Sequence, residues 1–341
     1  MNIALVAQRA RVSTATVSRV LNGTAAVRPL TAERVREAVE ALNYYRDTNA
    51  RALGSGRSGL YGLIISDITN PYFPELVKSF EDIAVEHGQD ILIANTNYDP
   101  VRMEACVIRM LQRKVDGVAI MTSEMDAHLL KNLSRREIPL IFMDLDSDIR
   151  GMCSVRVDYA AGVELAMEHL FGLGHRRIAF LSGPMKLASA RVRAEAFMRC
   201  LKTHGASEEP HLFQEGDHRV EGGRAAMQRI LEKGKRPTAV LASNDLTAIG
   251  ALGAIHHAGL RIPEDISVIG FDGIELSAYT EPPLTTLLIS RRDLAATAFR
   301  SLYQRRSQAT GKRNGNKEYV IQPQLVIRQS TAAVPAARKP R

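Results

Sequence analysis

Between Val12 and Asn22, hydrogen-bonding and cationic side chains gather on one side of a short predicted helix. Val17, Val20 and Leu21 fall at helical spacing, so they can pack inward as one apolar stripe. The face that points away carries Thr14, Ala15, Ser18 and Arg19. An arginine can donate two hydrogen bonds to a guanine edge, and a threonine offers a hydroxyl or a methyl to a base. The stretch therefore has the chemistry of a major-groove reader, with an ordinary amphipathic surface helix as the alternative.

Two further predicted helices flank this stretch and would position it. Residues 3–10 form the first, with their apolar side chains on one face. Asn22-Gly23 ends the second helix, since both residues accept the left-handed conformation of a helix terminus. Pro29 suits the first turn of a third helix, which runs to about residue 44. Three short helices joined by tight turns predict an all-α helix-turn-helix head over residues 1–45.

The positive charge of the chain is concentrated near its beginning. The 341 residues carry a net charge of +8, and residues 1–58 hold nine arginines against four acidic residues. A basic segment ahead of a nearly neutral body indicates a nucleic-acid-binding module attached to another domain. A solvated surface could carry the same charge, so this feature supports the helix pattern and does not replace it.

Three segments of the chain, VSTATVSRVLNG, ERVREAVEALNYY and ARAL, share a pattern with one family. The chain resembles the lactose-repressor (LacI) family of bacterial transcription regulators, and the resemblance extends over nearly its whole length. It implies that Thr14, Ala15 and Arg19 read base edges in the major groove. It also implies that Thr16, Ser18 and Asn22 contact phosphates, which position the reader without specifying sequence.

Two residues of the head depart from the pattern of that family. Arg11 stands in the turn where the family usually has Gly, and Arg28 stands where the third helix usually opens on Ser. An arginine cannot accept a hydrogen bond as an N-cap, but Arg28 can contact a phosphate instead. We therefore count Arg28 among the expected DNA contacts.

Residues 46–59 are predicted to be a linker whose second half is flexible by composition. In the family, a hinge helix at this place lies in the minor groove and wedges a leucine between base pairs. The resemblance assigns that wedge to Leu53 and includes Arg51 among the DNA contacts; the alternative is a leucine that packs on its own domain. Residues 54–59 also match the dinucleotide fingerprint GxGxxG. That motif must follow a strand and open a helix, so nucleotide binding is rejected there.

From residue 60 onward, apolar runs alternate with amphipathic segments. Strands are expected at 60–66, 90–94, 117–121 and 139–143, and in a second series at 178–182, 239–242, 267–271 and 286–289. Helices are expected near 74–87, 101–113, 126–135, 160–172, 192–204, 219–233, 245–258 and 291–309. Repeated strand–helix units with buried strands indicate parallel sheets that are covered by helices on both faces.

This part of the chain is predicted to be an α/β domain of two similar lobes, which resembles the periplasmic sugar-binding-protein fold. In that fold the chain crosses between the lobes more than once. We expect an effector-binding and dimerisation domain over residues 60–328 and a flexible basic tail over 329–341. The expected division is a first lobe of residues 60–159 and 291–321, and a second lobe of residues 160–290 and 322–328.

Polar and aromatic side chains follow several of the predicted strands, and ligands of open α/β sheets bind beyond the carboxyl ends of strands. Tyr72 and Phe73 offer faces for stacking on a sugar or a base. Arg193 lies in RAEAF, which matches the effector-binding arginine of the family, although Ala196 replaces a usual Gly. The other candidates are Asn70, Asp144, Asn244, Asp245 and Asp272. Each alone could be a cap or a salt-bridge partner; together they suit the hydroxyls of a neutral polyol.

The identity of the ligand stays open in the sequence. Ile289 stands where many sugar-binding relatives carry Gln, so one wall of the cleft is expected to be less polar. The segments NTNYDP, RKVDG and FDGIELSAYTEPPLTT resemble ribose- and purine-type repressors. The ligand is therefore expected to be a sugar or sugar derivative, with a purine co-repressor as the alternative.

These features predict a homodimeric, sequence-specific repressor of a carbohydrate-utilisation operon, controlled by the small molecule in the cleft. Two heads on a two-fold dimer predict a near-palindromic operator in double-stranded DNA. A solute-binding protein of a transport system would share the lobes, but it would need a signal peptide and has no use for an arginine-rich head.

Other classes of function find no support in the sequence. GxSxG, HExxH and P-loop motifs are missing, so we expect no enzyme, no catalytic residue, no metal ligand and no cofactor. The three cysteines are widely spaced and form no CxxC pair, which fits a reducing cytoplasm. No apolar run approaches the roughly 20 residues of a membrane span. The expected location is the cytoplasm, without a membrane partner.

Overall fold

The computed structural model describes residues 2–23, 27–45, 57–122, 138–144, 153–233, 235–307 and 317–334. These residues belong to two compact units, Met1–Ser58 and Gly59–Arg341, each of which is described by itself. The helix expected at 126–135 lies outside the described residues, as do Arg51 and Leu53 of the linker. Among the described residues, no helix is long and apolar enough to cross a membrane.

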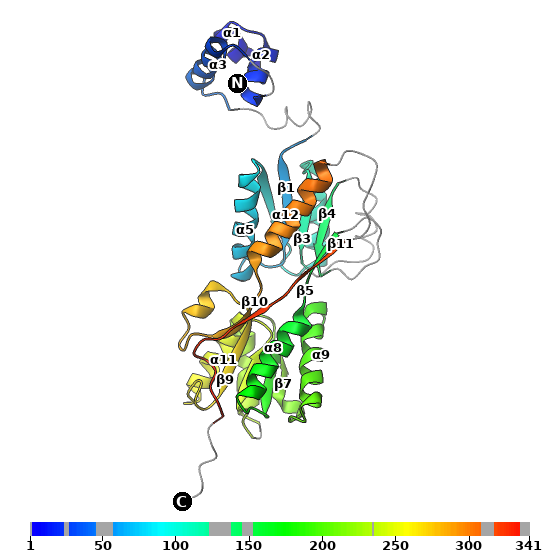
Figure 1. Cartoon of the computed structure of the whole chain (residues 1–341), viewed down its shortest axis with the longest axis vertical. Coiled ribbons are helices and arrows are strands. Elements are labelled where there is room, and N and C mark those ends of the chain that lie inside the picture. Colours follow the sequence, from blue (N-terminus) through cyan, green and yellow to red (C-terminus); the bar gives the residue numbers. More distant parts are fainter. Residues whose placement is uncertain are drawn as a thin grey trace, which may run out of the picture. The chain divides into compact units, whose positions relative to one another are not determined.

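The first unit consists of α1 (Ile3–Ala10), α2 (Thr14–Asn22) and α3 (Pro29–Ala41), drawn in blue in Figure 1. Their apolar faces meet in one small core, formed by Val6, Ala7, Ala10, Val17, Val35 and Ala38. Val20 and Leu21 pack against this core, as the predicted stripe requires. The all-α helix-turn-helix head expected from the sequence is confirmed.

The two arginines that depart from the family pattern lie at helix ends. Arg11 closes α1 with a φ of 54°, in the left-handed region where glycine carries no steric cost. Arg28 precedes α3 and makes no side-chain capping hydrogen bond, as expected for a residue without an acceptor. In contrast, the Ser13 hydroxyl accepts a hydrogen bond from the Thr16 amide at 3.2 Å and so caps α2.

The first lobe of the second unit is a six-stranded sheet in the order β11-β5-β4-β3-β1-β2, and all five strand pairs are parallel. Its strands are β1 (Leu60–Ile65), β2 (Asp90–Asn95), β3 (Gly117–Met121), β4 (Leu140–Met143), β5 (Cys153–Val157) and β11 (Lys317–Ile321). Both faces of the sheet are buried, because successive side chains of β1 enter two different cores. Leu63 and Ile65 pack in one core with α5 (Tyr72–Glu86) and α12 (Arg291–Ser307), whereas Ile64 packs with α6 (Pro100–Gln112).

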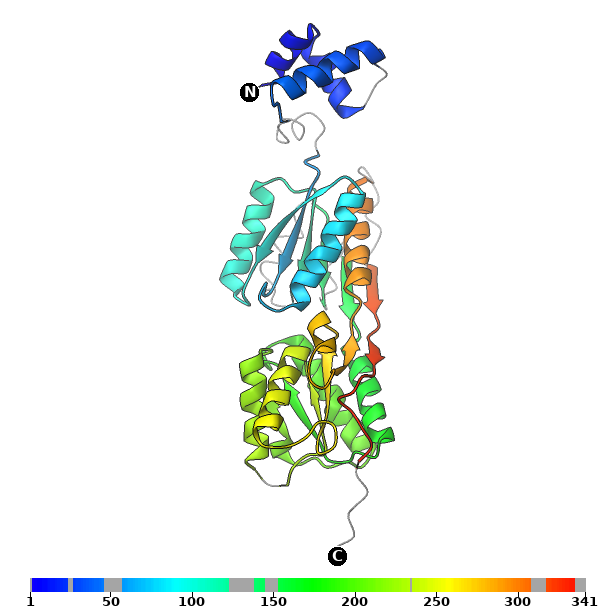
Figure 2. The ribbon, with the colours of Figure 1, turned by 90° about the vertical axis from the view of Figure 1, so that its left-hand side faces the viewer.

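The second lobe repeats this arrangement with the order β12-β10-β9-β8-β6-β7. Figure 2 shows this lobe below the first one. Its strands are β6 (Ile178–Ser182), β7 (Phe213–Glu215), β8 (Ala239–Ala242), β9 (Ser267–Asp272), β10 (Thr285–Leu288) and β12 (Gln324–Val326). Only the β10–β12 pair is antiparallel among the described strand pairs of this sheet. The helices are α8 (Tyr159–Gly172), α9 (Ala188–Thr203), α10 (Val220–Leu231) and α11 (Asp245–His257), with the 3-10 turns η1 (Pro210–Leu212) and η2 (Glu275–Ala278).

The chain passes between the two lobes at three places. β5 leads into α8, β10 leads back through α12, and β11 is followed after two residues by β12 in the other sheet. α12 packs beside α5 and against β3 of the first lobe (Figure 1). The two-lobed α/β architecture expected from the sequence is confirmed.

Four strands are absent from the expected series: β5, β7, β11 and β12. Two of them have only three residues, and β5, β7, β11 and β12 all carry polar or charged residues, as in CSVRV and KEYVI. Three lie at sheet edges, where fewer side chains need to be apolar. Short or polar edge strands give too weak a periodicity for detection.

The segment expected to begin a flexible tail is instead bound to the second lobe. The Ser330 hydroxyl donates to the Val268 carbonyl at 2.6 Å and accepts from the Thr285 amide at 2.8 Å. Farther along, the Val334 amide donates to the Leu173 carbonyl at 3.0 Å. Residues 329–334 are therefore an ordered strap, held by partners more than 40 residues away, and residues 335–341 lie outside the described part.

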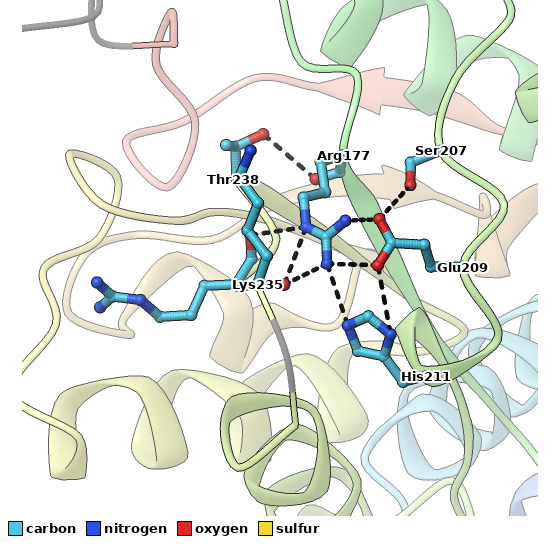
Figure 3. A network of polar contacts seen from close by, with 7 residues as sticks. Arg177, Ser207, Glu209, His211, Lys235 and Thr238 are labelled. Carbon is cyan, nitrogen blue, oxygen red and sulfur yellow. Dashed lines mark hydrogen bonds and ion pairs between the residues drawn. The ribbon is translucent and has the colours of Figure 1, made fainter.

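A polar network fixes the starts of two strands at the far end of the second sheet (Figure 3). Arg177, just before β6, donates to Glu209 Oε2 at 2.9 Å and to the Lys235 carbonyl at 2.9 Å. Thr238, just before β8, donates its amide to the Arg177 carbonyl at 2.9 Å. The network ties together loops at the amino ends of the strands, opposite the carboxyl ends where ligands of such sheets bind.

Candidate functional site

The outer face of α2 carries the side chains expected to read DNA. Thr14, Ala15 and Arg19 are exposed, whereas Val17 between them is fully buried. The opposite orientations follow from the helical period, which places residues 14, 15, 18 and 19 away from the buried stripe. Thr16 and Ser18 are half-buried, and the Thr16 hydroxyl lies 2.9 Å from that of Ser13 at the start of the helix.

The other expected DNA contacts are only partly visible. Arg28 is exposed beside α3. Asn22 ends α2, but its side chain lies outside the described atoms, and Arg51 and Leu53 lie outside the described residues. The described residues thus include the helix expected to read the major groove, and the expected wedge lies outside them.

Within the second unit, one pocket lies where the carboxyl ends of the two sheets face each other. From the first lobe it is lined by residues that follow β1, β3 and β4, and from the second by residues of α9 and the ends of β8 and β9. Seven of the eight expected effector contacts line it: Asn70, Tyr72, Phe73, Asp144, Arg193, Asn244 and Asp272. Ile289, expected as a less polar wall, also lines it.

Asp144 is a buried carboxyl whose two oxygens are both engaged by its own chain. Oδ1 accepts from the Val157 amide at 3.0 Å, and Oδ2 accepts from the Tyr159 hydroxyl at 2.6 Å. Burial raises the pKa of Asp144, against the lowering effect of these two hydrogen bonds. Asp144 has a φ of 54°, so its carboxyl reaches the pocket from a left-handed backbone.

Arg193 and Asp272 form the charged part of the pocket. The Arg193 guanidinium lies over the rings of Tyr159, at 3.9 Å, and Phe271, at 4.6 Å from the ring centres. Its Nη2 lies 3.9 Å from Asp272 Oδ1, too long for a strong hydrogen bond. Burial raises the pKa of Asp272 to about 7, although Arg193 and Arg291 act to lower it. Asp272 is therefore the carboxyl of the pocket that has most hydrogen-bonding capacity left.

The two amide side chains shape loops at the same time as they line the pocket. Asn244 caps α11 by accepting from the Thr247 amide at 2.9 Å, and its Nδ2 donates to the His218 carbonyl at 3.0 Å. Asn70 Oδ1 accepts from the Tyr72 amide at 3.1 Å. Both residues thus hold the first turn of a helix beside the pocket.

Asp245 is the one expected contact that the structure places elsewhere. It is fully buried and does not line the pocket. Its Oδ2 accepts from the Ile274 amide at 2.8 Å, and its Oδ1 accepts from the Thr286 hydroxyl at 2.5 Å. Sequence adjacency to Asn244 suggested a ligand contact, but Asn244 faces the pocket as an N-cap and the next residue, inside the helix, turns toward β9 and β10.

Several lining residues were missed by the sequence reasoning: Ser66, Tyr98, Met121, Thr122, Met143, Tyr159, Leu187, Ser189 and His218. Tyr159 follows β5, which was not recognised, and His218 lies in the loop after the unrecognised β7. Both would have been candidates had these strands been found, since residues beyond strand ends were the criterion.

Three polar atoms of the pocket residues are buried without a hydrogen-bond partner among the described residues: the Tyr72 hydroxyl, Arg193 Nε and His218 Nε2. Burial and the nearby Arg193 lower the pKa of His218 to about 3, so its imidazole is neutral at physiological pH. Buried polar atoms usually have partners, so three in one pocket indicate a place for a polar ligand. No cluster of metal-ligating side chains occurs in the described ranges.

Comparison with known proteins identifies both parts of the chain. Residues 2–47 match the bacterial regulatory proteins of the lacI family, and residues 167–331 match the periplasmic binding protein-like domain. The HTH-type transcriptional repressor PurR of Aliivibrio fischeri (strain MJ11) is 35% identical over 328 residues, which cover 95% of this chain and 96% of that protein. The repressor of the same name from Edwardsiella ictaluri is 35% identical over 332 residues, covering 97% and 96%.

Solved structures are similar over the same length. The lac repressor dimer bound to operator and the anti-inducer ONPF has a TM-score of 0.84 and 31% identity, covering 98% of this chain and 99% of that chain. The transcriptional regulator CelR in complex with cellobiose has a TM-score of 0.72 and 26% identity, covering 97% and 99%. The chain belongs to the lacI family of bacterial regulatory proteins, a family of DNA-binding transcriptional repressors that carry a ligand-binding domain.

Proposed function

We propose that this chain represses transcription as a homodimer that binds a near-palindromic operator, and that a small molecule in the pocket sets its affinity for DNA. Thr14, Ala15 and Arg19 would contact base edges, and Arg28 a phosphate. The observation that carries the ligand part is the set of buried, unpartnered polar atoms on Tyr72, Arg193 and His218. A bound molecule can change DNA affinity only if it prefers one arrangement of the lobes.

The chemistry of the pocket favours an uncharged ligand. Arg193 is the single guanidinium that lines the pocket, it shares the pocket with the two carboxyl groups of Asp144 and Asp272, and His218 adds no positive charge. An anionic sugar acid or phosphate would therefore have one cation to pair with and would lie beside two carboxyl groups. A sugar or sugar derivative fits because adjacent hydroxyls can donate to Asp272 and accept from Arg193.

A purine is the second candidate, as a co-repressor that strengthens operator binding. Four aromatic residues line the pocket, Tyr72, Phe73, Tyr98 and Tyr159, and a flat heterocycle can stack on such faces. The relatives that are 35% identical are repressors named PurR. The direction of the response distinguishes the two candidates, because an inducer releases DNA and a co-repressor tightens binding.

The DNA part can be tested with duplexes that the full-length chain selects from a random library. We expect near-palindromic sequences and an affinity that falls steeply with salt, because phosphate contacts release counterions. Arg19→Ala should weaken binding to the selected duplex roughly 10-fold to 100-fold, as expected for loss of a base contact. Arg36→Ala removes the same charge from the exposed side of α3 and serves as the matched control.

Fluorescence anisotropy on the selected duplex and on a scrambled one separates the outcomes. Arg36→Ala should affect both duplexes alike, whereas Arg19→Ala should affect mainly the selected duplex. Equal losses for both variants on both duplexes would contradict base reading by α2. The ligand part is tested by adding D-ribose, D-glucose, D-gluconate, hypoxanthine or guanine; if none changes anisotropy or melting temperature, the proposed effector class is wrong.

A further inference from the structure

The segment that carries Asp272 has an unusual backbone conformation. Asp272 ends β9 with a φ of 105°, and Gly273 follows with a φ of 68°. A side chain at position 273 would not fit, because a Cβ there would lie 2.7 Å from Leu288 Cα. A positive φ is costly for a residue with a side chain, such as Asp272, and persists only where neighbouring groups hold it.

Asp245 holds this segment from inside the second lobe. Its carboxyl group accepts hydrogen bonds from the amides of Gly273 and Ile274, the latter at 2.8 Å. Gly270 leaves room for this approach, since a Cβ there would lie 2.1 Å from Asp245 Oδ1. The two amides that follow Asp272 are therefore fixed by one buried side chain.

Arg291, the first residue of α12, holds the carbonyl groups of the same segment. Its Nη1 donates to the Asp272 carbonyl at 2.6 Å, and its Nη2 donates to the Gly273 carbonyl at 2.8 Å. The guanidinium is largely buried, so water competes little for these bonds. Asp272 is thus held on its carbonyl side by Arg291 and on the following amide side by Asp245.

Glu75 on α5 joins the segment to the first lobe. Its Oε2 forms an ion pair with Arg291 Nη2 at 2.8 Å, and its Oε1 accepts from the Glu275 amide at 3.0 Å. Glu75 therefore touches both the arginine that holds Asp272 and the first residue of η2. Neither Glu75 nor Arg291 lines the pocket.

We propose that Arg291 and Glu75 are positioning residues for the effector pocket. The pair holds residues 272–275 in the conformation that presents the Asp272 carboxyl to the ligand, and it connects this segment to α5 of the first lobe. A ligand that binds Asp272 thereby acts on a segment of the second lobe that is hydrogen-bonded to the first lobe, which is the kind of physical connection that coupling requires. The proposal rests on the proposed function for its ligand, but its backbone part is independent of any ligand.

The test uses hydrogen–deuterium exchange of the ligand-free, full-length chain, followed by mass spectrometry. Arg291→Gln and Glu75→Ala should each raise exchange of the amides at 273–275 about tenfold. In each variant, the segment can open locally without breaking the hydrogen bonds that the replaced side chain makes in the wild type. Arg292→Gln on α12 and Glu81→Ala on α5 are exposed neighbours and serve as matched controls, with exchange as in the wild type. The double variant should exchange little faster than either single variant, since the two residues act as one unit.

Each outcome decides the proposal. Unchanged exchange at 273–275, or an equal rise across the whole second lobe, overturns it. For any compound that the wild type binds, Arg291→Gln should weaken binding about tenfold, whereas Arg292→Gln should leave the affinity unchanged. Faster exchange in Arg291→Gln with an unchanged affinity for the compound also overturns the positioning role. If the wild type binds none of the five compounds, the proposed effector class fails, and the exchange data alone decide whether the pair holds Asp272.

Discussion

The two aspartates at strand ends of the pocket differ in what their carboxyl groups already bind. Each oxygen of Asp144 already accepts one hydrogen bond, from Val157 or from Tyr159, whereas Asp272 has only the distant guanidinium of Arg193. Burial raises the pKa of Asp272 to about 7, so the folded chain takes up a proton that the unfolded chain would release. The protonated carboxyl adds a hydrogen-bond donor to the pocket. Loss of this proton at higher pH should change the free energy of unfolding.

We predict that this proton makes stability depend on pH. A carboxyl with a raised pKa stabilises the fold below its unfolded pKa, and this contribution is lost as pH rises through the folded value. From about pH 6.5 to pH 8, the free energy of unfolding should fall by about 1 kcal/mol through Asp272. Urea unfolding at several pH values measures it, and Asp272→Asn should remove the decline.

Below about pH 6.5, His218 changes the free energy of unfolding in the opposite direction. Its lowered pKa of about 3 means that stability is lost as pH falls below the ordinary histidine value. The other ionisable groups around Asp272 are the same in the wild type and in Asp272→Asn. They are Asp144, Asp245, Glu75, Arg193 and Arg291. An Asp272→Asn chain that declines as steeply as the wild type above about pH 6.5 would show that Asp272 titrates elsewhere.

At the scale of elements, the turn between α1 and α2 has a backbone conformation that lowers the stability of the head. Arg11 has a φ of 54° at the end of α1, where a left-handed residue other than glycine loses about 1 kcal/mol. We predict that Arg11→Gly raises the free energy of unfolding of the head by roughly 0.5–1 kcal/mol. Calorimetry of the full-length chain, following the transition of the head, measures this.

Arg11→Ala is the matched control for that substitution. It removes the same guanidinium but keeps a Cβ in the left-handed conformation, so the head should gain no stability. If both variants lose DNA affinity equally, the arginine contributes a phosphate contact, and this contact offsets the backbone cost when DNA is bound. A head that is equally stable in both variants would show that the turn is not strained.

At the scale of the whole molecule, the two compact units should separate in function. Unit 1 spans Met1–Ser58 and holds the expected base contacts, and unit 2 spans Gly59–Arg341 and holds all the described residues that line the pocket. We predict that a fragment of residues 59–341 binds the same compounds as the full-length chain but no selected operator, because every residue that we expect to contact a base is missing. Calorimetric titration and fluorescence anisotropy measure the two properties.

The expected affinity of the fragment for each compound lies within a factor of about three of the full-length value in the absence of DNA, since distant sites are usually additive. In the presence of operator DNA, only the full-length chain should show a changed ligand affinity, because coupling is reciprocal. Loss of ligand binding in a folded fragment would mean that the head takes part in the pocket.

Local features of the sequence were sufficient for the head and for most of the lobes. The helix boundaries follow from residues that act on their own neighbours, such as Ser13 at the start of α2 and Gly23 after its end. The apolar runs of β1, β3, β4, β6, β8 and β9 identify buried parallel strands, because both faces of such strands must be apolar. These signals lie within a few residues, so the sequence alone carries them.

The tertiary structure decided what depends on distant partners. The short strands β7 and β12 form only because they pair with neighbouring strands of the second sheet. Residues 329–334 are hydrogen-bonded to the second lobe, and Tyr159 and His218 line the pocket. The tertiary structure also separated two adjacent residues, with Asn244 lining the pocket and Asp245 hydrogen-bonded to the segment that follows Asp272. These roles arise from contacts between segments many residues apart, and local residue patterns do not encode which segments meet.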